Sequence, residues 1–505
     1  MLQLGLIATF VLLCLLFFFS IIYLSTRSES SSLNNSKLPR SYPLIGSIFA
    51  VFANRNQRHQ WLTEVIRNSP TGTFVLHRTF GQLQIFTANP ANVQHILKTH
   101  FNFYPKGELS NTIYSDFLGS GIFNADGDNW KLQRQISSHE FNTKSIRKFV
   151  QTVVETELSD RLLPILAGAA TTTESVIDLQ NILERFTFDN ICKIAFGFDP
   201  EFLLPSLPPT EFAVAFELAT MESSNRFIAM FPAIWKVKRA LDIGSEKYVR
   251  QAVSQVREFA QNMVKKKKHG LNAETDDLLS RLLNSCQLSE TLVTDMVISF
   301  ILAGRDTTSA ALTWFFWLVS QNSHVEKEIL SEIREKSKSP NYEEVKDMVY
   351  IHASLCESMR LFPPVAADTK VAASDDILPD GTLVKKGMRV TYHIYAMGRM
   401  EKLWGLDWPE YRPERWLEKD NVTGKWNFIP KDAYAYPVFQ AGPRVCLGKD
   451  MAFLQMKKIV AGVLRHFRVV PIIDKGSEPV YNAFITSKMI GGFQVRIEQR
   501  GDQSL

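Results

Sequence analysis

The chain of 505 residues is long enough for one large domain or for two or three of ordinary size, and 45% of it is hydrophobic, as in a globular protein with a substantial core. A formal net charge of only +5 gives no argument for a nucleic-acid partner. The cysteines are few, odd in number and far apart, which argues against structural disulfides and is typical of a reducing compartment: Cys14, Cys192, Cys286, Cys356 and Cys446.

The first predicted element is an apolar segment, residues 4–24, which carries no charge. About 20 apolar residues span a bilayer as a helix. The basic start, short apolar core and small-residue cleavage site of a signal peptide are not evident. Basic residues follow the segment but none precedes it, so the positive-inside rule places the rest of the chain in the cytosol. We therefore expect residues 1–25 to be a retained, single-pass transmembrane anchor.

Residues 26–46 begin as a polar, serine-rich stretch and end with Pro39, Pro43 and Gly46. This composition predicts a flexible linker followed by a stiff hinge at the exit from the membrane. Residues 47–505 are then expected to form one domain.

Within that domain, residues 73–86 have the pattern of a β-hairpin that turns near Gly81. Most of the chain up to about residue 360 has helical spacing, whereas later apolar runs are short and interrupted by proline and glycine. The predicted fold class is therefore mainly α with small β-sheets. No complete glycine-rich nucleotide motif occurs, so the chain shows no nicotinamide or flavin site of its own.

The stretch 227–235 is strongly apolar and is followed by basic residues. It is either a core helix with a basic end or a loop that enters the headgroup layer of a membrane. Further along, the run of four lysines at 265–268 predicts a solvated helix end or loop.

A long helix is predicted from Ser289, a plausible N-cap with Glu290 behind it, to Ser320. Its centre, residues 303–308, breaks local rules because a glycine and two threonines weaken helix propensity and an Arg-Asp pair interrupts an apolar run. Such a break often marks a functional site. The alternative is that these polar side chains hydrogen-bond to carbonyls four residues earlier in the helix.

Two pairs of residues at helical spacing are weak evidence of function on their own. Trp130 and Arg134 would share one face of a helix, as would Glu357 and Arg360. The first pair is compatible with a surface arginine stacked on an indole. The second is a common helical ion pair, usually worth a few tenths of a kcal/mol.

The stretch Phe439-Gln-Ala-Gly-Pro-Arg-Val-Cys446-Leu-Gly448 places one cysteine in a loop rich in turn residues. No second cysteine or histidine pair stands nearby to form a disulfide or a zinc site. The simplest interpretation of an isolated cysteine is a free thiol. The alternative is a single axial thiolate for a metal that brings its other ligands, as haem iron does.

This loop matches F-x-x-G-x-R-x-C-x-G at every fixed position and resembles the cysteine-ligand loop of the cytochromes P-450. Residues 303–308 are similar to the oxygen-activation motif of the central helix in that family. Glu357 and Arg360, together with Arg415 in the later P-E-R-W stretch, resemble a buried charge triad, and Trp130 with Arg134 resembles a W-x-x-x-R motif. The motifs occur in family order between residues 39 and 492.

The resemblance implies a cytochrome P-450 fold that binds haem b, iron protoporphyrin IX. Cys446 would be the axial metal ligand, in a loop framed by Phe439 and Gly448. Haem propionates would be held by Trp130, Arg134 and Arg444. Thr307 would handle oxygen and Asp306 would relay protons as the catalytic pair, and the structural charge triad would be Glu357, Arg360 and Arg415.

The expected pocket is apolar. Small Ala303 and Gly304 would leave room above the flat cofactor, and substrate contacts would come from Phe123, Ala367 and Phe484. Several stretches, including residues 101–107 and 186–192, are similar to the plant fatty-acid ω-hydroxylases. The substrate would then be a lipophilic small molecule, a fatty acid oxidised at its terminal methyl, or alternatively a jasmonoyl–amino acid conjugate.

The resemblance further implies a location in the endoplasmic reticulum membrane with the domain in the cytosol. NADPH–cytochrome P-450 reductase would be the partner that delivers electrons. Basic residues on the cysteine side are candidates for docking it, although they are equally compatible with plain surface charge: Lys131, Lys449, Lys457 and Lys458.

Two other functions are weighed. A haem-thiolate hydroperoxide isomerase or dehydratase commonly lacks the threonine motif, so the intact Asp306-Thr307 pair argues against it. A non-catalytic haem sensor or electron carrier would need neither an acid–alcohol pair nor an apolar pocket.

Overall fold

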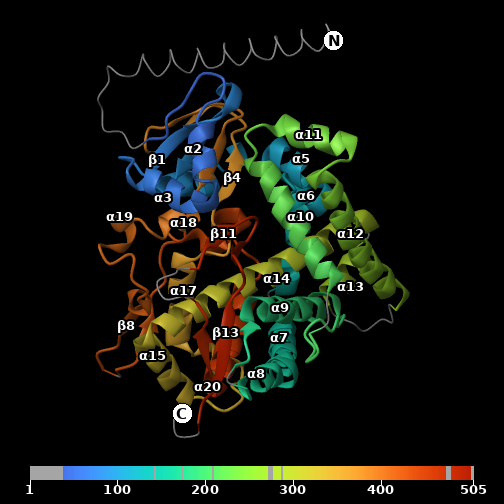
Figure 1. Cartoon of the computed structure of the whole chain (residues 1–505), viewed down its shortest axis with the longest axis vertical. Helices are drawn as coiled ribbons and strands as arrows, with labels where there is room; N and C mark the ends of the chain where they lie inside the picture. The colour runs from blue at the N-terminus through green and yellow to red at the C-terminus, as the bar shows by residue number, and fades with distance from the viewer. Residues whose placement is uncertain are drawn as a thin grey trace.

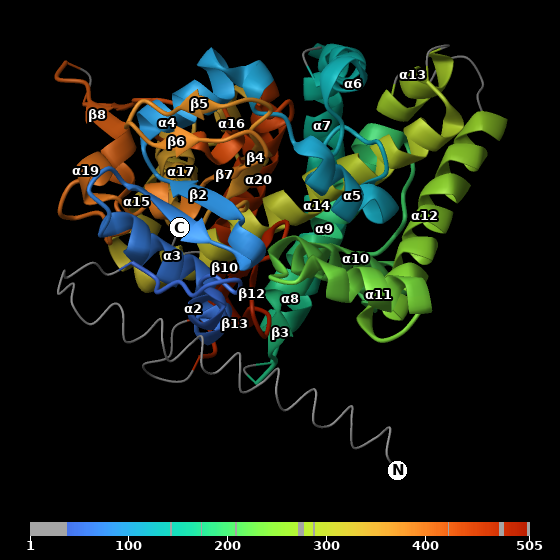
Figure 2. The ribbon, with the colours of Figure 1, turned by 90° about the horizontal axis from the view of Figure 1, so that it is seen from above.

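The computed structural model of the chain describes residues 38–501, apart from 142–143, 173, 208–209, 271–276, 286–287, 423 and 474–478. Helix α14 (Glu290–Gln321) crosses the middle of the molecule. Short strands and their covering helices lie on one side of it and a group of long helices on the other, as Figures 1 and 2 show. The predicted class, mainly α with small β-sheets, is confirmed.

The main sheet joins distant parts of the chain. Its strand order is β1 (Thr73–His77), β2 (Leu83–Thr87), β7 (Arg389–Tyr392) and β4 (Asp368–Val371). β1 and β2 are the predicted hairpin, antiparallel with Thr73 opposite Thr87, and Gly81 in the turn has a positive φ of 72°. β2 then pairs in parallel with β7, which ties the N-terminal part of the domain to its C-terminal third.

The remaining strands are short, and all but β3 follow residue 360, as the sequence predicts. One three-stranded sheet has the order β10 (Phe467–Pro471), β13 (Gln494–Gln499) and β3 (Ile177–Asp178). Three two-stranded sheets are β11 (Tyr481–Ala483) with β12 (Ser487–Met489), β5 (Asp376–Ile377) with β6 (Leu383–Val384), and β8 (Leu417–Lys419) with β9 (Trp426–Phe428).

Helices account for most of the domain. Those before α14 are α2 (Ile48–Ala53), α3 (Arg58–Arg67), α4 (Pro90–Gln94), α5 (Gly107–Leu118), α6 (Gly127–Phe141), α7 (Lys144–Glu157), α8 (Leu163–Ala170), α9 (Leu179–Phe196), α10 (Glu211–Ile228), α11 (Pro232–Leu241), α12 (Ser245–His269) and α13 (Leu278–Asn284). Those after it are α15 (Ser323–Arg334), α16 (Tyr342–Lys346), α17 (Val349–Leu361), α18 (Ile394–Met397), α19 (Glu401–Trp404) and α20 (Lys449–His466).

The predicted bounds of the long central helix are confirmed. The Ser289 hydroxyl accepts a hydrogen bond from Leu292 N at 3.2 Å and caps the helix. Most of α14 is buried because it packs against α9, α12, α17 and α20. It therefore belongs to two hydrophobic clusters, one shared with α17 and α20 and one shared with α9, α10 and α12.

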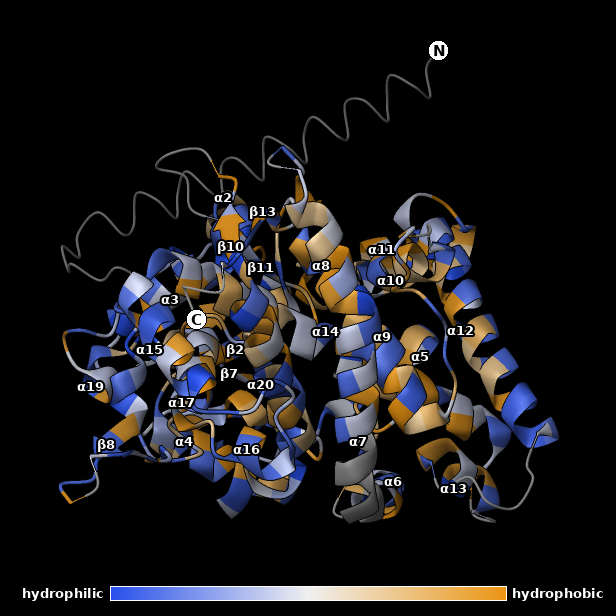
Figure 3. Ribbon diagram, turned by 90° about the horizontal axis from the view of Figure 1, so that it is seen from below, coloured by the Kyte–Doolittle hydropathy of each residue, from blue (hydrophilic) through white to orange (hydrophobic). Residues whose placement is uncertain are grey.

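Surface helices show the expected amphipathic pattern. Hydrophobic and hydrophilic residues alternate along α12 in Figure 3, and its buried face includes Val249, Val256 and Val264. The four-lysine run ends this helix, so the prediction of a helix end is confirmed.

The apolar stretch 227–235 is not one core helix. α10 ends at Ile228 and α11 begins at Pro232, so the stretch contains a turn. Trp235 is buried, whereas the Ile234 side chain is 55% exposed. No described helix is long and apolar enough to cross a membrane, and the predicted span 4–24 lies outside the described residues.

Candidate haem site

The cysteine loop is held in a fixed shape by backbone contacts. Cys446 N donates a hydrogen bond to Phe439 O at 2.8 Å, which closes the loop just before α20. Gly442 has a φ of 64°, and a Cβ atom there would lie 2.1 Å from the Leu97 carbonyl oxygen. Only glycine fits this close approach, so the glycine of the motif has a steric reason.

Cys446 is accessible from outside the protein. Its side chain is exposed, unlike the buried Cys192 and Cys356 among the described cysteines. Nevertheless, desolvation by the surrounding protein raises the pKa of the Cys446 thiol, while the Gly448 N–H, Arg134 and Lys449 act to lower it. The net effect of the protein alone is to raise this pKa, so the thiolate that binds a metal would depend on the charge of the metal itself.

Two predicted propionate-binding residues lie together next to this loop. The Arg444 guanidinium lies over the buried Trp130 ring, 4.5 Å from its centre. Its Nη2 donates to Asp126 Oδ1 at 2.7 Å and to Ala125 O at 3.0 Å. Arg134 is close enough to Cys446 and Arg444 to interact with both electrostatically. The structure therefore brings the predicted Trp130, Arg134 and Arg444 to one place.

Sequence reasoning missed a buried carboxylate with two lysines beside this group. Asp368 binds Lys106 Nζ and Lys370 Nζ, each at 2.8 Å. Burial lowers the pKa of Lys370 to about 7, and the charge of Arg444 contributes to the shift. Lys370 follows the proline pair and Lys106 belongs to the 101–107 stretch. The partner that unites them is 262 residues from Lys106, and no local pattern could indicate it.

The charge of this region fits a haem. Haem carries two propionate carboxylates on one edge, and arginine and lysine are the residues that bind such groups. Four basic residues face two carboxylates here, and positive charge stays in excess even when Lys370, whose pKa is about 7, is neutral: Lys106, Arg134, Lys370 and Arg444 against Asp126 and Asp368. Together with the accessible thiol, this donor set suits a haem whose propionates balance the excess.

The centre of α14 contains the predicted acid and alcohol. Thr307 Oγ1 donates to Ala303 O at 2.6 Å, so the back-bonding interpretation holds for this hydroxyl. Its oxygen keeps lone pairs with which to accept a proton donor. Asp306 is buried, with Oδ1 at 3.2 Å from Arg305 Nη1. Desolvation raises the pKa of Asp306, while Arg305 and Lys488 act to lower it.

Gly304 requires a correction. It was expected to leave room above the cofactor, but a Cβ atom at this position would lie 2.6 Å from Ile191 Cγ1 of α9. Its missing side chain therefore permits the close packing of two helices. Ala303, the preceding residue, is partly accessible.

The predicted substrate contacts lie on three segments next to α14. The loop of Phe123, whose side chain is 42% exposed, follows Gly121, where a Cβ would meet the Ser299 hydroxyl of α14. The turn of Phe484 ends in Thr486, whose Oγ1 lies 3.5 Å from Asp306 Oδ2.

The segment that leads to Ala367 is fastened to the same β11–β12 hairpin. Ser487 N donates to Pro364 O at 2.7 Å and Tyr481 OH to Pro363 O at 2.8 Å. The structure thus places Ala367 and Phe484 on segments that are hydrogen-bonded to one another.

The predicted charge triad is formed. Arg360 binds Glu357 through two hydrogen bonds of 2.7 Å, and Arg415 Nε donates to the same carboxylate at 3.1 Å. Glu357 and Arg360 are almost fully buried. Trp416 Nε1 adds a further hydrogen bond to Glu357 at 2.9 Å.

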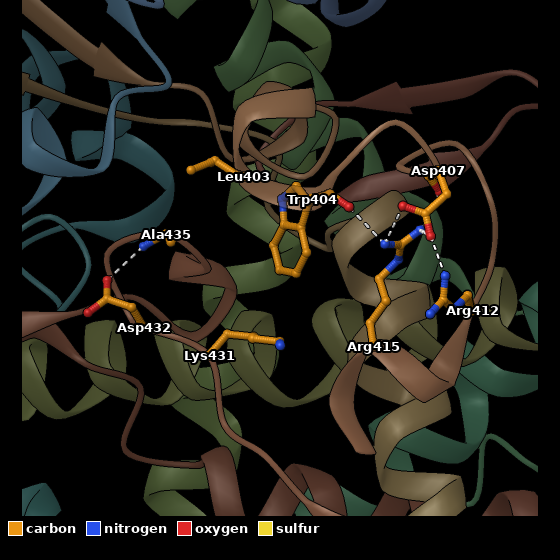
Figure 4. Close-up of a pocket in the computed structure, with 8 residues that line it drawn as sticks. All are labelled: Leu403, Trp404, Asp407, Arg412, Arg415, Lys431, Asp432 and Ala435. Atoms are coloured by element: carbon orange, nitrogen blue, oxygen red, sulfur yellow. Dashed lines mark hydrogen bonds and ion pairs between the residues drawn. The ribbon is translucent and has the colours of Figure 1, made fainter. Parts of the chain in front are cut away.

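Arg415 also reaches the wall of a pocket of about 400 Å³, shown in Figure 4, where it points toward Asp407 and the Trp404 carbonyl. The lining residues are Leu403, Trp404, Asp407, Arg412, Arg415, Lys431, Asp432 and Ala435.

Two of the candidate docking lysines are buried. Lys457 donates to the Lys346 carbonyl and Lys458 pairs with Glu155, which corrects the expectation that they are available to a partner. Lys131 and Lys449 are exposed.

The structure combines a cysteine loop held by backbone hydrogen bonds with a cluster of basic residues beside it. It also has an acid–alcohol pair in the central helix and a buried charge triad. This combination is typical of haem-thiolate proteins. Comparison with known proteins is consistent with this class. The family model described as cytochrome P-450 matches residues 37–495.

Three curated plant proteins show the extent of the similarity. Cytochrome P-450 94A2 of Vicia sativa is 59% identical over 95% of this chain and 96% of its own. Cytochrome P-450 94B1 of Arabidopsis thaliana is 47% identical over 92% and 91%. Cytochrome P-450 86B1 of Arabidopsis thaliana is 38% identical over 91% and 85%. The chain belongs to the cytochrome P-450 family and is a monooxygenase with haem as its cofactor.

Proposed function

We propose that this monooxygenase hydroxylates the terminal methyl group of fatty acids, using O2 and electrons that NADPH supplies through a flavin reductase. The observation that carries the proposal is the hairpin turn with Phe484. The Thr486 hydroxyl of this turn lies 3.5 Å from Asp306 of α14, and the hairpin is hydrogen-bonded to the segment before Ala367, which supports a pocket formed by these segments beside the acid.

Terminal attack is a problem of positioning. A primary C–H bond is harder to break than the secondary bond beside it, so a loose pocket yields in-chain products. Selectivity for the end of the chain then depends on how the substrate is held. The hydrogen bonds from Ser487 and Tyr481 to the proline segment stiffen the region of Ala367 and Phe484 and support such a constraint.

The roles proposed for the other residues follow their chemistry. Bound haem would supply the centre at which O2 is activated. Cys446 would hold the iron, and the excess positive charge around Arg444, Lys106 and Lys370 would hold the propionates. Asp306 would give protons to Thr307, whose hydroxyl would deliver them to the reacting oxygen.

We also propose that the protein is anchored in the endoplasmic reticulum membrane by residues 1–25, with the domain in the cytosol. Apolar side chains exposed on the described domain support contact with a lipid surface: Leu44, Phe49, Phe52, Phe80, Ile234, Val237 and Leu241. Two of their segments are adjacent, since the Phe80 and Phe231 rings lie 6.2 Å apart. Carbonate extraction of membranes tests the anchor, because an integral protein stays in the pellet.

Product analysis tests the function. The enzyme, with its reductase, NADPH and O2, is offered fatty acids of increasing length and jasmonoyl-isoleucine. Terminal hydroxylation of fatty acids is the expected result. Products only from the jasmonoyl conjugate, or rearranged hydroperoxides formed without NADPH, would contradict it.

Variants at the proposed throat sharpen the test. Ala367→Leu and Phe484→Ala change the space beside the reacting carbon in opposite directions, so the ratio of terminal to in-chain alcohol should change. Exposed Leu383→Ala is the matched control and should keep the wild-type ratio. Terminal hydroxylation that stays constant across both throat variants would rule out this location of the selectivity.

A further inference from the structure

Asp306 stands at the buried end of a ladder of ion pairs that begins at the surface. Lys488 Nζ lies 3.1 Å from Glu217 and 3.1 Å from Glu184. Arg305 lies 3.1 Å from Glu184 and 3.2 Å from Asp306. The five residues come from α9, α10, α14 and β12, so the fold alone brings them together.

Accessibility decreases from one end of this ladder to the other. The Glu217 side chain is 53% exposed, that of Glu184 10%, and that of Asp306 3%. Consecutive carboxylates share a cation, and because Glu217 and Glu184 both touch the Lys488 nitrogen, their oxygens are at most about 6 Å apart. One or two waters bridge carboxylates at such a separation.

The positive and negative charges of the ladder nearly balance. Three carboxylates face two cations, while Arg185 interacts electrostatically with Glu184 and Arg305 from α9. Asp306 Oδ1 and Arg305 Nη1 are both buried and lie 3.2 Å apart as an ion pair, but among the described residues neither atom makes a hydrogen bond of good geometry. Buried polar atoms in this state require an explanation, such as a water or a role in the reaction.

We propose that Glu217 and Glu184 form the route by which protons from solvent reach Asp306, with Lys488 and Arg305 holding the carboxylates in place. A proton enters at Glu217 from water, passes to Glu184 and then to Asp306. Each transfer breaks one O–H bond and forms another, and no electron moves. The monooxygenase reaction consumes two protons with O2 and the two electrons of NADPH, so the route operates twice in each turnover.

The alternative is that the ladder only fastens four elements together. Both interpretations predict a loss of stability when one residue of the ladder is replaced, so a stability measurement does not separate them. Glu184→Gln keeps the shape of the side chain and one acceptor oxygen, but it cannot carry a proton as a carboxylate does. Glu184→Asp keeps the carboxylate and loses a methylene, so it is the matched partner variant.

The experiment uses the holoenzyme with its reductase and dodecanoate, and measures product and hydrogen peroxide per NADPH consumed, in H2O and in D2O. Because positioned proton transfer contributes about 10²–10⁴-fold to a rate, we expect Glu184→Gln to lower product per NADPH by about tenfold. The missing electrons should appear as peroxide, and the solvent isotope effect should increase. Glu184→Asp should restore most of the coupling, and Glu217→Gln at the exposed entrance should cause a smaller loss of the same kind.

Lys385→Met is the control, since it removes an exposed ion pair with Asp375 far from the acid in sequence and leaves the ladder intact. It should behave as the wild type. If Glu184→Gln and Glu217→Gln keep the wild-type coupling and isotope effect, or if Glu184→Asp is impaired as much as Glu184→Gln, the proton route is wrong and the ladder is structural.

A second readout does not depend on turnover. The Asp306 carboxyl band in the infrared spectrum of the holoenzyme, assigned by its loss in Asp306→Asn, should titrate at higher pH in Lys488→Met, because Lys488 favours the ionised form. If the pH at which the band titrates is unchanged, Lys488 does not influence the ionisation of Asp306. The proposal rests on the monooxygenase reaction and not on terminal selectivity, so any hydroxylated position on dodecanoate serves. If dodecanoate is not hydroxylated, the infrared titration alone tests whether Lys488 acts on Asp306.

Discussion

At the scale of single residues, Glu357 shows how a buried charge is made tolerable. Its two carboxylate oxygens receive hydrogen bonds from Arg360, Arg415 and Trp416, and it also accepts from Arg412 N at 3.1 Å. A buried ion costs free energy to desolvate, and only complete pairing offsets that cost. The group joins α17 to the segment that leads into the cysteine loop, so losing one member leaves a charge without a partner where the cofactor loop is supported.

Arg415→Met should lower the free energy of unfolding of the holoenzyme by about 3–5 kcal/mol, because it leaves Glu357 underpaired in the interior. Arg412→Met is a matched control. Arg412 pairs with Asp407 in the same loop but is 51% exposed, and exposed pairs are worth about 0–1 kcal/mol. Urea denaturation measures both variants, and equal losses would contradict the structural role of Arg415.

At the scale of elements, α14 combines weak helix propensity in its centre with tight packing against α9. Thr187 Oγ1 of α9 donates to Arg305 O at 2.9 Å, next to the place where Gly304 meets Ile191. The two helices are thus held together by this glycine contact, by this hydrogen bond and by the ion pair between Arg305 and Glu184. This contact fixes Arg305 and Asp306, and with them the acid that is proposed to relay protons.

Gly304→Ala should destabilise the protein by about 1–3 kcal/mol, since the added methyl overpacks the contact with Ile191. Combining it with Ile191→Ala should recover part of that loss in a double-mutant cycle. Gly168→Ala in α8 is the control, because nothing lies within 4 Å of its Cβ position, and it should stabilise by about 0.5–1 kcal/mol. If Gly304→Ala is as harmless as Gly168→Ala, the packing explanation is wrong.

Local signals explain which elements could be predicted. The hairpin at 73–86 and the helix from Ser289 carry their own turn, cap and periodicity, and both appear with the expected bounds. The triad could be predicted because its members match a family motif. The role of Gly304 could not, since its partner Ile191 lies on another helix and helical periodicity does not indicate which helix packs against which.

The same limit applies to charge. Asp368 with Lys106, and Glu184 with Lys488, are joined across 262 and 304 residues, and each residue alone resembles an ordinary surface charge. The apolar stretch 227–235 was ambiguous for a different reason. Its composition fits a buried helix, but Pro232 starts a new helix and places Ile234 at the surface.

At the scale of the whole molecule, the N-terminal part of the domain and its C-terminal third share one sheet and one buried polar contact. His393 follows β7 and accepts a hydrogen bond from Ala396 N at Nδ1, 3.1 Å, which caps α18. Its Nε2 lies 3.1 Å from His59 Nδ1 of α3. Burial, with the charges of Arg58 and Arg399, lowers the pKa of His393 to about 3, so the imidazole stays neutral in the folded protein.

Acid should therefore destabilise the domain through His393. In the unfolded chain a histidine has a pKa of about 6.5, so between pH 6.5 and 3 the unfolded state binds one proton more than the folded state. Stability from this residue is present above pH 6.5 and falls by about 1.4 kcal/mol per pH unit as the pH decreases through that window. His393→Asn keeps a capping acceptor without this titration, so its stability should depend less steeply on acid. A slope equal to that of the wild type would exclude His393 as the cause.

The central claim, that Cys446 holds the haem iron as a thiolate, has one direct measurement. The spectrum of the reduced enzyme with carbon monoxide should show the red-shifted Soret band that marks a thiolate ligand, and Cys446→Ala should lack it. Cys356→Ala is the control, because that thiol is buried in α17 and the band should persist. A thiolate band that survives in Cys446→Ala, or disappears in Cys356→Ala with the protein folded, would contradict this assignment.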